Sequence, residues 1–81
     1  MTHELKTWTE YFKDVKSGIK TFEVRKDDRD FQVGDFLLLK ECDPQWGTYT
    51  GAYISTQVTY VLRGGPFVPD GICIMSIKII P

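Results

Sequence analysis

The sequence has few of the residues and segments that mark metal centres, disulfide frameworks or membrane spans. It contains two cysteines and a single histidine with no metal-ligand spacing, so we expect no metal and no cofactor. Its longest unbroken apolar runs, residues 36–39 and 72–75, are far shorter than the roughly 20 residues of a transmembrane helix. The first residues also lack the basic and apolar regions of a signal peptide. We therefore expect a cytoplasmic protein without membrane association, whose cysteines stay reduced.

What the sequence does have is enough for one small core. Its 81 residues predict a single domain spanning 1–81, with 42% hydrophobic and 14% aromatic residues. The net charge is −1, yet the charges are unevenly placed, because 16 of the 21 charged side chains fall in residues 1–40. A broad basic surface for long duplexes is therefore not expected, and a compact charged site in the first half is.

A short strand at residues 3–6 and one helix after it are expected near the N-terminus. Thr7 and Glu10 stand at the spacing of a capping box, which satisfies backbone amides at the start of a helix. Apolar residues then recur at intervals of three and four, the period of one helix face. These residues are Trp8, Tyr11, Phe12, Val15 and Ile19. Gly18 is expected to end the helix, because glycine adopts the left-handed conformation without a clash.

The rest of the chain is predicted to be strands. In residues 21–25 the period changes to two, which predicts a strand with Phe22 and Val24 inward and Glu23 and Arg25 outward. Further strands are expected at 36–41, 53–62 and 72–80, with residues 43–51 as a loop. Cys42 and Cys73 are expected to act as small core residues. The fold class is therefore α+β, mostly β: a small β-barrel of about five strands that closes on itself, with the N-terminal helix plugging one mouth.

The charged residues around the strand at 21–25 are the strongest candidates for a site. Arg25 and Arg29 could hold a phosphate or carboxylate, while Glu23 orients a guanidinium or accepts from a base. Lys20, at the junction from the helix, and Lys6 complete the candidate ligand-binding set. The alternative is that Glu23 and Arg25 form a solvent-exposed ion pair with no ligand.

Other candidates depend on where the fold places them. His3 is either solvated or a proton carrier, if its strand packs beside Lys20. Trp46 and Tyr49 either stack on a ligand base or fold back onto their own loop. A third possibility, a surface for protein partners that the sequence does not identify, draws on exposed aromatic residues. Those residues are Trp46, Tyr49, Tyr53 and Phe67. No nucleophile elbow surrounds any serine.

The segment from Gly18 to Arg25 also carries a family resemblance. Its pattern G-x-K-x-x-E-x-R, followed by Phe-Gln-Val-Gly-Asp at 31–35, resembles the activating signal cointegrator homology (ASCH) domains of the PUA-like superfamily. More narrowly, the Trp-x-x-Tyr-Phe helix, the Asp-Arg-Asp-Phe segment at 28–31 and the closing Met-Ser-Ile-Lys at 75–78 are similar to short bacterial and phage ASCH-related proteins. This resemblance covers nearly the whole chain.

The resemblance implies a PUA-like β-barrel that binds RNA or a nucleotide-like ligand. The implied site is a cleft between helix and barrel, lined by Lys20, Glu23 and Arg25. Some ASCH proteins resemble amidohydrolases of acylated cytidine, with a threonine where this chain has Glu23. A carboxylate cannot supply a hydroxyl nucleophile. The alternative function is therefore a small hydrolase of modified nucleosides or RNA, amidohydrolase-like or ribonuclease-like, with Lys20 and Glu23 as an acid and base pair and His3 as proton carrier.

Overall fold

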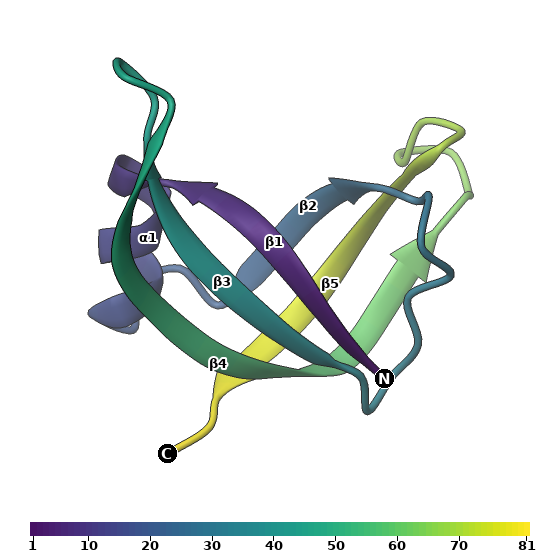
Figure 1. Ribbon diagram of the computed structural model, residues 1–81. Helices are drawn as coiled ribbons and strands as arrows, with labels where there is room; N and C mark the ends of the chain where they lie inside the picture. Colours follow the sequence, from purple (N-terminus) through teal and green to yellow (C-terminus); the bar gives the residue numbers. More distant parts are fainter.

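The computed structural model describes residues 1–81 as one helix and five strands (Figure 1). In chain order the elements are β1 (Thr2–Trp8), α1 (Thr9–Lys16), β2 (Phe22–Lys26), β3 (Phe36–Asp43), β4 (Thr48–Arg63) and β5 (Ile72–Ile79). The prediction of a mostly-β α+β fold with five strands and an N-terminal helix is confirmed. The only helix is eight residues long, too short to cross a membrane.

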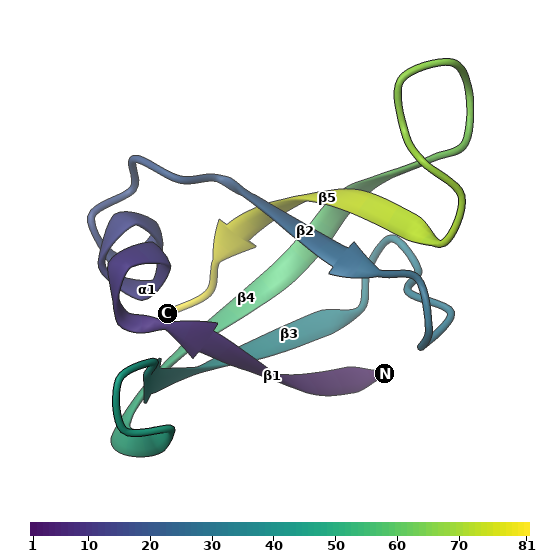
Figure 2. The same cartoon turned by 90° about the horizontal axis from the view of Figure 1, so that it is seen from above.

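The strands form one sheet in the order β1-β3-β4-β5-β2, which curls into a half-barrel (Figures 1 and 2). β1 pairs with β3 in parallel, and the other three pairings are antiparallel. β4 is 16 residues long and is shared along its length by β3 and β5, so it carries much of the curvature. β1 and β2 are the two edges of the sheet and have no backbone ladder between them. The curl therefore stops short of a hydrogen-bonded barrel and leaves a seam between β1 and β2.

The core fills the concave side of the sheet, and α1 covers one end of it (Figure 2). Buried apolar residues come from β1, β3, β4, β5, α1 and the segment that precedes β3. They include Leu5, Val15, Phe31, Leu37, Leu39, Val58 and Met75. Cys42 and Cys73 are both free and buried, as predicted, and burial raises the pKa of the Cys73 thiol.

The start of α1 differs from the prediction. Thr7 belongs to β1 and the N-cap residue is Trp8, which makes no side-chain capping bond, so there is no capping box. The parallel pairing of β1 with β3 extends through Trp8 and keeps Thr7 in extended backbone. Gly18 ends the helix as expected, with a φ of 85°.

The buried face of α1 is narrower than predicted. Only Phe12 and Val15 enter the core, because the short helix meets the sheet over about two turns. Trp8 and Tyr11 are half exposed, and Ile19 lies beyond the helix with 79% of its surface exposed.

The orientation of β2 is opposite to the prediction. Glu23 is buried and faces Met75 of β5 in the sheet register, whereas Phe22 and Val24 are half exposed. Paired residues on adjacent strands share a face of the sheet. Because Met75 and Cys73 belong to the core, their partners Glu23 and Arg25 must point to the same concave side.

The loop between β3 and β4 is also shorter than expected. The turn occupies residues 44–47 only, and the pairing continues from Asp43 with Thr48. A register shift between Lys40 and Cys42 accommodates residues 50–52 of β4, two of which we expected in the loop.

Candidate functional site

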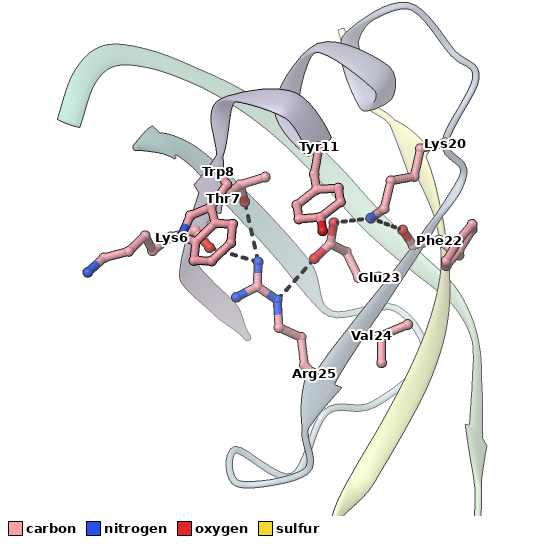
Figure 3. A pocket seen from close by; sticks show the side chains of 9 residues that line it. All are labelled: Lys6, Thr7, Trp8, Tyr11, Lys20, Phe22, Glu23, Val24 and Arg25. Atoms are coloured by element: carbon pink, nitrogen blue, oxygen red, sulfur yellow. Dashed lines mark hydrogen bonds and ion pairs between the residues drawn. The ribbon is translucent and has the colours of Figure 1, made fainter. Parts of the chain in front are cut away.

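A pocket of about 490 Å³ opens at the seam between β1 and β2 (Figure 3). The end of β1, the start of α1 and β2 contribute its walls. The lining residues are Lys6, Thr7, Trp8, Tyr11, Lys20, Phe22, Glu23, Val24 and Arg25. The fold therefore brings together four of the five predicted ligand-binding residues: Lys6, Lys20, Glu23 and Arg25.

Glu23 is the centre of the charged network in this pocket. Its side chain is 4% exposed, and its two oxygens accept from two different cations. Lys20 Nζ donates to Oε1 over 2.9 Å, and Arg25 Nε donates to Oε2 over 3.0 Å (Figure 3). Glu23 and Arg25 therefore do form an ion pair, but it is not solvent-exposed, because the carboxylate is buried beneath both cations. Glu23 is placed to position Arg25 and Lys20.

Arg25 also reaches across the seam. Its Nη2 donates to the carbonyl oxygen of Lys6 over 2.9 Å and to the hydroxyl of Thr7 over 3.3 Å (Figure 3). Further along, Arg29 Nη1 donates to the carbonyl oxygen of Glu4 over 2.8 Å. An edge strand presents unpaired carbonyl groups, and these two arginines satisfy two of them on β1. Arg25 on β2 and Arg29 in the segment that follows it thus connect to β1 where no backbone ladder does.

Several cationic donors in the pocket remain without a protein partner. Arg25 Nη1 donates to no protein acceptor, and neither does the ammonium group of Lys6. The Lys20 ammonium has more partners within the chain, since besides Glu23 it donates to the carbonyl of Phe22 over 2.6 Å and lies 4.9 Å from the centre of the Phe22 ring. Lys6 and Arg25 are therefore the groups best placed to meet an anion.

An aromatic wall stands beside these cations. Trp8 and Tyr11 are stacked with their ring centres 6.3 Å apart and their planes 15° apart. The neighbouring Glu10 carboxylate raises the pKa of the Tyr11 hydroxyl. Thr7, Trp8 and Tyr11 are pocket residues that the sequence patterns did not predict. Their spacing in the sequence indicated a capping box and a buried helix face, so no sequence signal marked them as pocket residues.

His3 lies outside this pocket. It is 6% exposed, its Nε2 is 2.8 Å from Oδ2 of Asp35, and its ring packs edge-on against Phe31. The same carboxylate accepts from the backbone amide of Gln32 over 3.1 Å. The hydrogen bond to His3 is the main reason that the pKa of Asp35 is lowered. His3 is thus neither solvated nor a member of the Lys20 cluster, and it links the start of β1 to the turn before β3.

The hairpin aromatics are separate from the pocket as well. Trp46 is 73% exposed and Tyr49 is 54% exposed, so neither folds back into a small core of the loop. Lys40 Nζ lies 4.9 Å from the centre of the Tyr49 ring. Tyr53 and Phe67 are exposed too. No group of three or more His, Cys, Asp and Glu side chains is arranged to hold a metal ion.

Comparison with known proteins places the chain in a sequence family. Residues 2–77 match the family model described as "Domain of unknown function (DUF3850)". The chain is also 36% identical over 70 residues to the "Uncharacterized 12.9 kDa protein in GpA 3'region" of Escherichia phage P2. This match covers 84% of the chain and 61% of the phage protein, so the chain spans about three-fifths of the length of that relative.

Proposed function

The chain belongs to the DUF3850 family, and we propose that it binds RNA or a nucleotide-like ligand in the pocket at the β1–β2 seam. In this proposal a base lies against the aromatic wall of Trp8 and Tyr11, and a phosphate meets Arg25 and Lys6. The pocket volume of about 490 Å³ has room for one nucleotide unit. The resemblance to ASCH domains supports the same ligand class, and we expect binding to take place in the cytoplasm.

The observation that carries the proposal is that only part of the Arg25 guanidinium is bound within the chain. Nε and Nη2 are fixed on Glu23, Lys6 and Thr7, which leaves Nη1 without an acceptor. A guanidinium held on one side loses little further freedom when its other side binds an anion. Proteins that bind single-stranded nucleic acids combine cationic side chains, which contact phosphates, with aromatic side chains, on which bases stack. Arg25 beside Trp8 and Tyr11 is such a combination.

The two tryptophans of the chain allow a direct binding assay. Trp8 lines the pocket, whereas Trp46 lies in the β3–β4 turn and does not. A Trp46→Phe variant therefore makes Trp8 the sole tryptophan reporter. We expect titration of this variant with a short single-stranded RNA to change the Trp8 fluorescence in a saturable way, because a stacked base quenches or shifts indole emission. No change at low salt, with RNA in large excess, would overturn the proposal.

Salt and charge variants distinguish the pocket from general attraction to a polyanion. The logarithm of the affinity should fall with the logarithm of salt concentration by about 0.7 per phosphate contacted. Lys6→Ala should weaken binding, because the Lys6 ammonium has no protein partner to lose and so acts only through the ligand. Lys78→Ala, on the exposed side of β5, removes the same charge away from the pocket. Equal weakening by both variants would contradict a defined site.

A second candidate function is hydrolysis of modified nucleosides or RNA. The observation in its favour is the contact of 2.9 Å between Lys20 Nζ and Glu23 Oε1, which places at the pocket wall the two groups that an acid and base pair needs. The buried His3 does not take part, because it is bound to Asp35. Incubation with acylated nucleosides and short RNAs should give product with the wild type and none with Lys20→Ala. Absence of product from the wild type would remove this candidate.

A further inference from the structure

A second, smaller cavity lies along the same seam as the pocket. It has a volume of about 200 Å³ and shares Arg25 with the first pocket. Its other lining residues are Leu5, Lys26, Asp28, Arg29 and Phe31. Three of its six residues are cations and one is an acid, so the cavity carries a net positive charge. Arg25 thus stands between two hollows of the same groove.

The cations of the second cavity keep free donors. Arg29 uses only Nη1, on the carbonyl of Glu4, and its Nε and Nη2 donate to no protein acceptor. The Lys26 side chain is exposed and makes no hydrogen bond or ion pair within the chain. Like Arg25, Arg29 is therefore fixed on one side by β1 and unoccupied on the other.

The spacing of the two arginines follows from the strand that holds them. They are anchored on the carbonyls of Lys6 and Glu4, which are two residues apart on β1 and project to the same side. Two residues of a strand span about 7 Å, so the two guanidinium groups are held at about that separation. Neighbouring phosphates of an extended single strand are comparably spaced.

We infer that the second cavity is a phosphate subsite, so that the groove takes a ligand with two consecutive phosphates, as in a single-stranded dinucleotide, rather than a lone nucleotide. This inference rests on the proposed function and extends it. One phosphate meets Arg25 and Lys6, and the next meets Arg29 and Lys26.

The test compares three ligands by calorimetry on the full chain. They are uridine 5′-monophosphate, the 5′-phosphorylated dinucleotide pUpU, and pUpU with a neutral methylphosphonate linkage in place of the internal phosphate. We expect pUpU to bind about tenfold tighter than the mononucleotide, as one added charge-assisted contact implies. The methylphosphonate analogue, which keeps both bases, should lose most of that gain.

Lys26→Ala locates the effect on the protein. Because the exposed Lys26 side chain makes no hydrogen bond or ion pair, and alanine keeps the backbone pairing with Ile72, this variant should fold normally. It should bind the mononucleotide as the wild type does and bind pUpU more weakly, with a salt dependence smaller by about 0.7. Lys78→Ala is the matched control and should bind all three ligands as the wild type does.

The outcomes separate this inference from the proposed function. If the mononucleotide binds and pUpU gains nothing, or if the neutral analogue binds as well as pUpU, the second subsite is wrong while the proposed function stands. Equal weakening of both ligands by Lys26→Ala would also overturn the subsite. If neither ligand binds, the proposed function itself fails.

Discussion

Arg25→Ala tests whether a side chain really holds the open edge of this half-barrel. The variant removes the bond from Nε to the Glu23 carboxylate and the two bonds from Nη2 to β1. It leaves one oxygen of a buried carboxylate and one edge carbonyl without their donors. The wild-type side chain is 24% exposed, so solvent replaces these contacts only in part.

The expected cost can be worked from these contacts. Removing one partner from a buried ion pair costs about 3–5 kcal/mol when the remaining charge has no other partner. Glu23 keeps its bond to Lys20, so its charge stays paired in the variant. The lost bond from Arg25 to Glu23 therefore costs about 1.5–2 kcal/mol, the lower part of the range for hydrogen bonds to charged groups. The lost bonds to Lys6 and Thr7, which are exposed or only partly buried, add about 0.5–1 kcal/mol. We therefore expect the free energy of unfolding to fall by about 2–3 kcal/mol.

Urea unfolding followed by circular dichroism measures this change. With a slope near 1 kcal/mol per molar, at the low end for small domains, the midpoint should fall by about 2–3 M. Arg25→Lys keeps the charge, but an ammonium cannot reach both Glu23 and β1 as the guanidinium fork does, so its midpoint should be intermediate. Arg29→Ala breaks one exposed bond and should cost about 1 kcal/mol or less. A loss below about 0.5 kcal/mol for Arg25→Ala, or equal losses for Arg25→Ala and Arg29→Ala, would refute the reasoning.

Three further predictions concern stability outside the seam. The pKa of Asp35 is lowered in the folded chain, so its carboxylate stabilises the fold above its ordinary pKa of 3.8, and this contribution is lost as pH falls through the folded-state value. The stability difference between wild type and Asp35→Asn should therefore shrink in acid urea titrations below pH 4; a constant difference would mean that the charge of Asp35 does not stabilise the fold. Gly18→Ala should cost about 1 kcal/mol in urea unfolding, because φ is 85° although no atom crowds the site; a neutral effect would show that the helix end is not fixed. Leu39→Ala empties a fully buried position and should lower the free energy of unfolding by about 2–5 kcal/mol in the same assay, whereas a loss under about 1 kcal/mol would mean that the core is loosely packed there.

The local patterns of the sequence predicted which elements form but not which way β2 faces. The alternation over 22–25 has two solutions, and the apolar pair Phe22 and Val24 favoured the one with Glu23 outward. Pairing with β5 decides otherwise, because Glu23 and Arg25 lie opposite Met75 and Cys73, whose side chains form the core. The carboxylate tolerates burial because Lys20 and Arg25 both donate to it. A pairing between distant parts of the chain fixed this orientation, and no local window contains it.

The sequence predicted most of the charged residues of the candidate site, but not how they are arranged in space. The charged residues of the first half do converge on one pocket, as the uneven charge distribution indicated. The bridging of β1 by Arg25 and Arg29 depends on the two edges of the sheet meeting without a ladder, which only the three-dimensional curl determines. The partner of His3, Asp35, is likewise 32 residues away and becomes a neighbour through the pairing of β1 with β3.

The most direct test of nucleotide binding at the seam is a nuclear magnetic resonance titration of the isotopically labelled chain with a 5′-phosphorylated dinucleotide. We expect the side-chain resonances of Arg25, the indole N–H of Trp8 and the backbone amides around Thr7 to shift together and saturate, while the indole N–H of Trp46 stays in place. Uniform small shifts, or shifts confined to the β3–β4 turn, would contradict binding in this pocket.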